Sequence, residues 1–295
     1  MIVTRNGSSI NVRCPAKLNL YLEVTGKRAD GYHDIETVMQ TVSLYDNLLI
    51  EPCEPPGAIL VECDDAAVPS GPENIVHRAA AEMRRATGRT EGVRMRLSKQ
   101  IPAGAGLAGG SSDAAGAIAG LNLLWDARLS RERLAQIGAA VGFDVPFFFT
   151  AGAAVCRGRG EIVEPLPPHR PQWFVIVWPE FELSTRSIYE TLSLDLTNRP
   201  ENDTIRDLIR LLDRTEPSQL GACFFNRLEK TATAVRSELV RIRQAMVEAG
   251  LKGVTMTGSG SAFFGLCERK EVAEKRSARL ADSGLRAFAC SSTSN

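Results

Sequence analysis

Apolar and polar residues alternate between residues 10 and 24, which is the pattern of a strand with one buried face. The apolar face carries Ala16, Leu18, Leu20 and Leu22. Lys17 and Asn19 therefore lie side by side on the opposite face of the strand. Because most such lysines face solvent, a solvated strand face is the first interpretation, and a functional pair of side chains is the second.

Two periodicities predict the other elements. Alternation or a short apolar run predicts strands over residues 35–42, 48–51, 59–63, 93–98, 151–163, 173–178 and 285–289, with two more strands within 253–266. Apolar residues spaced by three and four predict helices over residues 74–86, from 111–113 to 125, and over 131–141, 184–192, 204–212, 232–249 and 271–281. We therefore predict an α+β fold.

A proline-rich stretch is the best candidate for a linker. Residues 164–171 read Glu-Pro-Leu-Pro-Pro-His-Arg-Pro, a composition that favours extended, stiff backbone. A chain of 295 residues is also long for one hydrophobic core. We therefore expect two domains, residues 1–166 and 167–295.

Composition narrows the classes of function. The chain has 35 Lys and Arg and 35 Asp and Glu, so it has no overall field for nucleic acid or an anionic membrane. No apolar run approaches the length of a membrane span, and the first residues lack the apolar core of a signal peptide. Seven cysteines without a Cys-x-x-Cys pair argue against a disulfide framework or structural zinc. We expect a cytoplasmic protein that binds neither nucleic acid nor membrane.

A glycine-rich stretch is the strongest candidate for chemistry. Gly104, Gly106, Gly109 and Gly110 lack Cβ atoms, so a bulky anion can approach the backbone N–H groups. The stretch leads into the predicted helix, whose N-terminus favours negative charge through free N–H groups and the helix dipole. The sequence therefore predicts a phosphate site.

Three alternatives compete with this interpretation. The spacing Gly-x-Gly-x-x-Gly from Gly104 matches the dinucleotide fingerprint, but that motif follows a buried parallel strand, whereas residues 93–97 alternate apolar with charged side chains. A Walker-type loop fails because Gly110 stands where its lysine precedes Ser111. A flexible loop with capping serines is the third alternative, although so many glycines before an alanine-rich helix are unusual as packing alone.

Three further positions have both a functional and a structural interpretation. Tyr32 and His33, on a polar turn, could stack on and hydrogen-bond a flat ring, or be a partly buried aromatic beside a satisfied histidine. Asp144, in an apolar segment, is either a general base or the cap of the proline-containing turn after it. The small-residue turn 257–261 either closes over the phosphates or is an ordinary hairpin.

Four blocks, taken in order, resemble the GHMP small-molecule kinases. They are Pro15-Ala16-Lys17-Leu18-Asn19-Leu20 with Arg28-Ala29-Asp30-Gly31-Tyr32-His33, residues 102–115, Asp144-Val145-Pro146, and Thr257-Gly258-Ser259-Gly260-Ser261. The glycine block alone indicates the superfamily. The Asp-Gly-Tyr-His block together with Pro-Ala-Lys-x-Asn resembles the branch whose substrate carries a cytidine diphosphate group.

The resemblance implies a two-domain kinase with its active site in the cleft between the domains. It implies transfer of the γ-phosphoryl group of ATP to a hydroxyl of that substrate, in the non-mevalonate route to isoprenoid precursors. Lys17 and Asp144 match the catalytic lysine and base of the family. The ATP phosphate loop is matched by Pro102, Ala103, Gly104, Ala105, Gly106, Leu107, Ala108, Gly109, Gly110, Ser111 and Ser112. Phosphoryl transfer implies Mg²⁺, with Ser111 or Ser112 as its contact.

The resemblance also assigns substrate contacts. Asn19, Tyr32 and His33 match residues that contact the substrate, the latter two at its cytosine ring. Tyr189 lies where the family often has an aromatic residue on the other face of that ring.

Two positions depart from the family pattern. Ala108 stands where many members have another glycine, and Arg227 interrupts an expected Asn-Asp-Leu-Glu sequence at residues 226–229.

The alternative functions are another GHMP kinase of the homoserine or mevalonate type, a non-catalytic nucleotide-binding regulator, and a nicotinamide-dependent oxidoreductase. The last of these rests on glycine spacing alone. We expect a monomer or a weak homodimer.

Overall fold

The computed structural model describes residues 1–150, 152–193, 204–213 and 216–293. The chain forms two compact units, each assembled from separate segments. Unit 1 consists of Met1–Ala16, Leu44–Ile101 and Ala108–Thr150, and unit 2 of Lys17–Ser43, Pro102–Leu107 and Ala151–Asn295. The long strands β2 (Ser9–Lys27) and β3 (His33–Cys53) contribute residues to both units. The predicted boundary after residue 166 falls inside unit 2, and a domain division there stays a prediction.

The sheet of unit 1 consists largely of antiparallel pairs. β1 (Ile2–Asn6) pairs with the first part of β2, and the last part of β3 pairs with β5 (Gly92–Ser98). β4 (Ile59–Cys63) pairs with β5 in parallel. Along β5, Val93 and Met95 are buried whereas Arg96 is exposed. The alternation in this segment therefore predicted a half-exposed antiparallel strand correctly.

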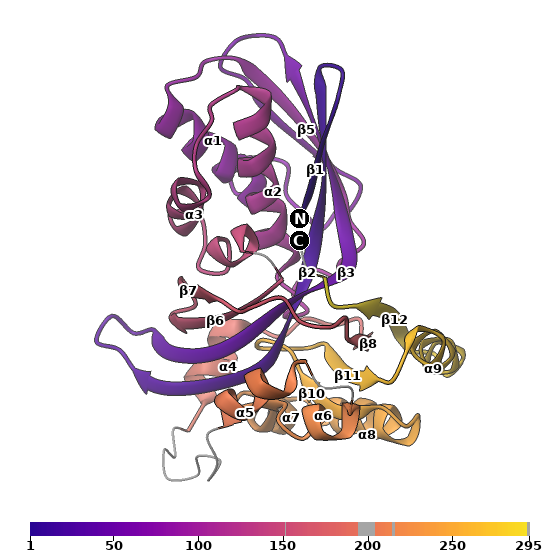
Figure 1. Ribbon diagram of the computed structural model, residues 1–295. Coiled ribbons are helices and arrows are strands. Elements are labelled where there is room, and N and C mark those ends of the chain that lie inside the picture. The colour runs from indigo at the N-terminus through magenta and orange to yellow at the C-terminus, as the bar shows by residue number, and fades with distance from the viewer. Residues whose placement is uncertain (151, 194–203, 214–215, 294–295) are drawn as a thin grey trace. The chain divides into compact units, whose positions relative to one another are not determined.

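Three helices lie together on one face of that sheet (Figure 1): α1 (Ile75–Thr87), α2 (Gly109–Leu124) and α3 (Arg131–Ala139). α1 begins where Asn74 Oδ1 accepts a hydrogen bond from the backbone N–H of Val76 at 2.7 Å. This is the N-cap interaction that favours asparagine before a helix. The periodicity of residues 74–86 therefore located this helix to within a residue.

α2 is buried on nearly all sides because small residues let it approach the sheet. A Cβ atom at Gly116 would lie 2.4 Å from Cys14 Sγ, and one at Gly120 would lie 2.4 Å from Ile50 Cδ1. Neither approach is compatible with a larger side chain. The alanines and glycines after the predicted phosphate loop therefore have a packing role inside unit 1.

Unit 2 contains a separate four-stranded antiparallel sheet with the order β10-β11-β8-β12. Its strands are β8 (Trp173–Trp178), β10 (Lys252–Met256), β11 (Phe263–Cys267) and β12 (Arg286–Ser291). The first part of β3 pairs with β6 (Ala153–Gly158), which pairs with β7 (Ile162–Pro165). β9 (Phe225–Asn226) pairs in parallel with β2 at Tyr21 and Leu22.

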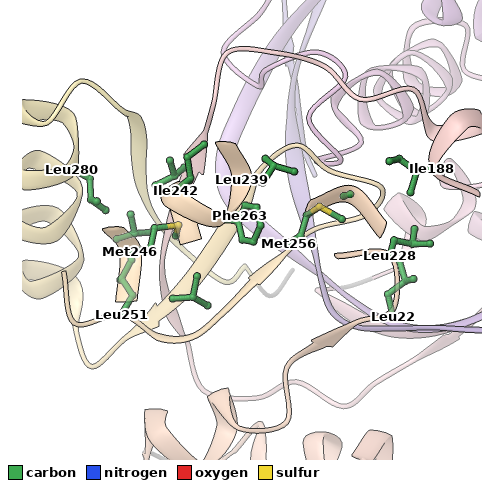
Figure 2. Packing of buried hydrophobic residues seen from close by; sticks show 14 of the residues in the cluster. Leu22, Ile188, Leu228, Leu239, Ile242, Met246, Leu251, Met256, Phe263 and Leu280 are labelled. Atoms are coloured by element: carbon green, nitrogen blue, oxygen red, sulfur yellow. The ribbon is translucent and has the colours of Figure 1, made fainter. Parts of the chain in front are cut away.

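Both faces of the four-stranded sheet are covered. On one face, α8 (Glu238–Glu248) and α9 (Lys270–Asp282) supply apolar side chains to the core. Figure 2 shows Leu239, Ile242 and Met246 near Phe263, with Leu280 of α9 farther out on the Met246 side of the same cluster. On the other face, the rings of Phe174 and Phe264 meet edge to face with centroids 6.0 Å apart, and both are fully buried.

The remaining helices of unit 2 are short. They are α4 (Thr185–Thr191), α5 (Thr204–Leu211), α6 (Pro217–Gly221) and α7 (Glu229–Val235). The single helix predicted over residues 232–249 is two helices, α7 and α8, because the backbone at Arg236 turns extended, with φ −135° and ψ 95°. Among the described residues, no helix combines the length and apolar character that crossing a membrane requires.

Candidate active site

Lys17 and Asn19 lie side by side on β2, as predicted, but their face of the strand is buried. Lys17 is 3% exposed and Asn19 is 1% exposed. Lys17 Nζ donates hydrogen bonds to Asn19 Oδ1 and to the Gly106 carbonyl oxygen, each at 2.6 Å. Asn19 Nδ2 donates to Thr37 Oγ1 at 2.9 Å. Because a buried ammonium group needs such partners, the oxygens fix its position. A solvated strand face was therefore the wrong interpretation.

The glycine loop and the second small-residue turn meet within unit 2. Gly106 has a φ of +79°, and a Cβ atom there would lie 2.1 Å from the Thr257 carbonyl oxygen. The Thr257 hydroxyl lies 3.3 Å from the Gly106 carbonyl oxygen. The backbone N–H of Ala262 donates to the Ala105 carbonyl at 3.1 Å. Both the left-handed backbone and this close approach require glycine at position 106.

α2 begins at Gly109, earlier than the spacing of its apolar residues predicted. The residue before it, Ala108, has φ 54° and ψ 33°, a left-handed conformation that glycine adopts at lower cost. No side chain caps this helix, although the first N–H groups of a helix need partners from outside it. An anion is a suitable partner at such an end. The left-handed backbone at position 108 thus gives a physical reason for the glycine that the family resemblance leads us to expect there.

Of the two serines predicted to contact Mg²⁺, Ser111 and Ser112, the second is the better candidate. Ser112 is fully buried in the first turn of α2, and its Oγ has no hydrogen-bond partner among the described residues. Ser111 is partly exposed. In the described part of the chain, no group of three or more His, Cys, Asp or Glu side chains is placed to hold a metal. A single hydroxyl fits Mg²⁺ in a kinase, because nucleotide phosphates and water supply the other ligands.

The first turn of α2 also carries a buried ionic cluster that sequence analysis missed. Lys99 Nζ donates to Asp113 Oδ2 at 2.8 Å and to Asp46 Oδ2, and none of the three side chains is more than 8% exposed. Asp46 Oδ1 accepts from the backbone N–H groups of Gln100 and Ile101 at 2.6 and 2.8 Å. The cluster ties the chain just before the glycine loop to the start of α2. Asp46 is 53 residues from Lys99, so no local spacing pairs them.

Two carboxylates share one ammonium group in this cluster. The pKa of Asp113 is raised to about 7, mainly by burial. The charge of Lys99 lowers this pKa, and the neighbouring Asp46 carboxylate raises it. Asp113 Oδ1 has no partner among the described residues, whereas Asp46 accepts two backbone N–H groups. Asp113 is therefore the carboxylate that holds a proton more readily. Burial alone would lower the pKa of Lys99, but the two carboxylates raise it, so Lys99 stays charged.

Asp144 lies in unit 1 just before the short 3₁₀ helix η1 (Pro146–Phe149). The N-cap position of η1 is occupied by Val145, and no side chain caps it. The capping interpretation of Asp144 was therefore wrong. Val145 is fully buried, and its Cγ1 would lie 2.7 Å from a Cβ atom at Gly138 in α3. This packing fixes the backbone at Asp144, which itself is half-buried.

The turn that carries Tyr32 and His33 is shaped by Arg28. The Arg28 guanidinium pairs with Asp30 at 3.1 Å and with Asp34 at 2.9 Å. The backbone N–H of Arg28 donates to the Tyr32 carbonyl at 2.8 Å, and Asp30 Oδ1 accepts from the Tyr32 N–H at 3.1 Å. The Arg-Ala-Asp-Gly-Tyr-His block therefore forms a turn that is held by ion pairs and hydrogen bonds, and its charged residues stabilise the conformation of the turn.

The aromatic side chains predicted for a cytosine site lie within unit 2. The His33 and Tyr189 rings are 5.1 Å apart between centroids. Tyr32 is 51% exposed, and the Arg159 guanidinium lies 5.5 Å from the centre of its ring. Burial, reinforced by the charge of Lys27, lowers the pKa of His33. The imidazole is therefore neutral at pH 7, with one donor and one acceptor nitrogen.

Arg227, which departs from the family pattern, has a specific partner in this chain. Its Nε and Nη2 atoms each lie 2.7 Å from an oxygen of Glu23, and both side chains are largely buried. The backbone N–H of Arg227 donates to the Leu22 carbonyl at 2.8 Å. A two-point pair of this kind fixes the geometry of both side chains. The departure therefore reinforces the attachment of β9 to β2.

Comparisons with known proteins identify the family. The GHMP kinases N terminal domain matches residues 74–152, and the GHMP kinases C terminal domain matches residues 200–284. A 4-diphosphocytidyl-2-C-methyl-D-erythritol kinase of Pelotomaculum thermopropionicum is 40% identical over 90% of this chain and 91% of its own length. The protein of that name from Exiguobacterium sibiricum is 41% identical over 95% of both chains.

A solved structure matches as well. The crystal structure of a 4-(cytidine 5'-diphospho)-2C-methyl-D-erythritol kinase superposes with a TM-score of 0.82 at 35% identity, over 97% of this chain and 100% of that chain. The matches confirm the α+β GHMP kinase fold and the resemblance found in the four sequence blocks. The chain therefore belongs to the GHMP kinase family and is an ATP-dependent small-molecule kinase.

Proposed function

We propose that this kinase transfers the γ-phosphoryl group of ATP to the 2-hydroxyl of 4-diphosphocytidyl-2-C-methyl-D-erythritol, in the non-mevalonate route to isoprenoid precursors. The relatives that carry this name support the choice of substrate, because they match nearly the whole chain. The observation that carries the proposed mechanism is the buried Lys17 ammonium, held 2.6 Å from the carbonyl oxygen of Gly106 in the glycine loop.

Lys17 supplies positive charge to the transferred phosphoryl group. Its side chain is held by two oxygens and buried, so it needs little reorganisation when negative charge develops in the transition state. A charge prepared in this way stabilises the transition state more than a mobile surface lysine would. Asn19, whose amide oxygen accepts from Lys17, orients the ammonium group and contacts the substrate in this proposal.

Asp144 accepts the proton of the attacking 2-hydroxyl. Its half-buried position, with a backbone fixed by the packing of Val145, suits a general base that must reach a bound substrate. In this mechanism the positive charge of Lys17 polarises the attacking hydroxyl. Neither residue replaces the other, so each is needed for turnover.

The glycine loop and the start of α2 hold the leaving diphosphate. Backbone N–H groups of residues 103–111 and the positive end of the α2 dipole favour the phosphates of the nucleotide. Mg²⁺ would be held by the hydroxyl of Ser112 or Ser111 together with the phosphates, and when bound it neutralises charge on the nucleotide.

Tyr32, His33 and Tyr189 recognise the cytosine ring. Tyr32 presents a half-exposed aromatic face for stacking, and the neutral His33 ring offers hydrogen-bonding nitrogens. Tyr189 contacts His33 and lies where the family places the second aromatic residue of the base site. The proposal also includes a cytoplasmic enzyme that is a monomer or a weak homodimer.

The test is ADP release with ATP, Mg²⁺ and each of three alcohols: the cytidyl substrate, homoserine and mevalonate. We expect turnover only with the cytidyl substrate, and a loss of about a hundredfold or more in kcat for Asp144→Asn. Turnover with homoserine or mevalonate instead would assign another GHMP activity. ATP binding without turnover of any of the three would point to a nucleotide-binding regulator.

A further inference from the structure

Asn226 lies outside the predicted catalytic machinery, yet its side-chain amide group hydrogen-bonds to the backbone of the second small-residue turn. It ends β9 and is 6% exposed. Nδ2 donates to the carbonyl oxygens of Met256 at 2.7 Å and Gly258 at 2.8 Å, and Oδ1 accepts from the Leu228 N–H at 2.9 Å. Both amide protons of Asn226 therefore point at the carbonyls on either side of Thr257.

Thr257, held between these two carbonyls, shares its partners with Lys17. Its Oγ1 accepts from the Asn19 N–H at 3.1 Å and lies 3.3 Å from both Asn19 Oδ1 and the Gly106 carbonyl oxygen. Those same two oxygens accept the hydrogen bonds of the Lys17 ammonium group. The Thr257 hydroxyl and the Lys17 ammonium thus converge on one pair of acceptors.

The turn also packs directly on the ammonium group. A Cβ atom at Gly258 would lie 3.0 Å from the Gly106 carbonyl oxygen and 3.3 Å from Lys17 Nζ. The turn, the glycine loop and Lys17 are therefore too closely packed for a side chain at position 258. A displacement of the Gly258 carbonyl therefore moves atoms that define where the ammonium group sits.

We infer that Asn226 is a positioning residue for Lys17, acting through the turn 257–261. This inference rests on the proposed function, in which Lys17 is catalytic. Removal of the Asn226 amide leaves two buried carbonyls without their donors, and the turn must shift to find others. Misplacement of a catalytic group by about 1 Å costs up to about a hundredfold in rate, without a matching loss of substrate binding.

The chain offers a matched control in unit 1. Asn122 makes the same kind of contact with a loop backbone: its Nδ2 donates to the Leu129 carbonyl at 3.3 Å, and its Oδ1 accepts from the Leu129 N–H at 3.0 Å. It is partly buried and braces the loop after α2. A general effect of losing a loop-bracing asparagine would therefore appear in both sets of variants.

The experiment compares Asn226→Ala and Asn226→Asp with Asn122→Ala and Asn122→Asp, below the melting temperature of each. We expect the Asn226 variants to lower kcat by about tenfold to a hundredfold, with both KM values within about threefold of native. The Asn122 variants should lose stability with kcat within about twofold of native. An unchanged kcat in folded Asn226 variants, or an equal loss in the Asn122 variants, would overturn the inference.

A double-mutant cycle tests the route of the effect. In a Lys17→Met background the Asn226→Ala change should lower the remaining kcat by less than about threefold, because the residue that it positions is already gone. Fully additive losses would show that Asn226 acts elsewhere.

A readout that needs no activity separates this inference from the proposed function. The ¹⁵N signal of the Lys17 ammonium, identified by its loss in Lys17→Met, should shift or disappear in Asn226→Ala and stay in place in Asn122→Ala. An unshifted signal in Asn226→Ala refutes the positioning role. If the native protein fails to phosphorylate the cytidyl substrate but this signal responds, the proposed substrate is wrong and the positioning of Lys17 stands.

Discussion

The ammonium group of Lys17 and the carbonyl oxygen of Gly106 are hydrogen-bonded at 2.6 Å although 89 residues separate them in sequence. The contact joins β2 to the glycine loop inside unit 2. It makes the loop a means of orienting the lysine, in addition to the phosphate-binding role that we propose for it. A loop of this composition therefore has to keep both its shape and its close approach to the turn 257–261.

Replacement of the lysine tests its charge directly. Lys17→Met keeps most of the buried side-chain volume and removes the ammonium group, so kcat should fall by about a hundredfold to a thousandfold. Lys275→Met, on the exposed face of α9, is the control and should retain native kcat. A Lys17→Met enzyme with near-native turnover would mean that this charge does not act on the transferred group.

Gly106→Ala should disable the loop. The new Cβ atom would lie 2.1 Å from the Thr257 carbonyl oxygen at a φ of +79°, so the loop and turn must separate. We expect kcat/KM to fall by at least about tenfold and the melting temperature to drop. Gly26→Ala serves as the control, because a Cβ atom at position 26 would have no heavy atom within 4 Å beyond its chain neighbours. Equal behaviour of the two variants would refute the close-approach argument.

Ala108→Gly should stabilise the protein. Ala108 is left-handed at φ 54°, a conformation that costs an alanine about 1–2 kcal/mol, of which the extra flexibility of glycine in the unfolded chain offsets part. A net gain of about 0.5–1 kcal/mol is expected in urea unfolding. Ala278→Gly, exposed inside α9, should instead lose about 1 kcal/mol. A loss of stability in both variants would count against strain at position 108.

The cluster of Lys99, Asp46 and Asp113 predicts a pH dependence of stability. The pKa of Asp113 rises from 3.8 to about 7 on folding, so between these values the folded state holds a proton that the unfolded chain releases. The contribution of Asp113 to stability therefore falls as pH rises from about 4 to about 7. Asp113→Asn removes this loss, and its free energy of unfolding relative to native should increase from about pH 5 to about pH 8. The exposed Asp282→Asn change should give no such trend.

Lys99→Met tests the same cluster from the other side. It leaves two buried carboxylates without their shared cation, an arrangement that costs about 3–5 kcal/mol when a buried pair is broken. Urea unfolding at about pH 8 should show this loss, and lowering the pH should recover part of it as a carboxylate is protonated. A loss below about 1 kcal/mol would mean that the cluster is not a stabilising feature.

Local pattern predicted what depends on local sequence. Periodicity located β5 and α1, and alternation put Lys17 beside Asn19 on one face of β2. It could not tell that this face is buried, because alternation reports polarity and the burying segments, Gly106 and Thr257, come from distant parts of the chain. Asp46 and Asn226 were missed for the same reason: each acts on backbone or charge far from it in sequence.

The residue types in the sequence predicted the chemistry of the candidate site, but they predicted its geometry only in part. The glycines indicated a phosphate site, but the left-handed backbone at Ala108 was unexpected because alanine rarely adopts it. Likewise, the departure from the family pattern at Arg227 is visible in the sequence, but only the three-dimensional structure revealed that Glu23 is its partner.

The most direct test of the account is ³¹P NMR of the product mixture formed from ATP, Mg²⁺ and 4-diphosphocytidyl-2-C-methyl-D-erythritol. The account predicts ADP together with one new phosphomonoester signal, with phosphorus coupled to carbon 2 of the methylerythritol, and both signals growing at least about a hundredfold more slowly with Asp144→Asn. ADP with inorganic phosphate alone, or a phosphomonoester at another carbon, would contradict it.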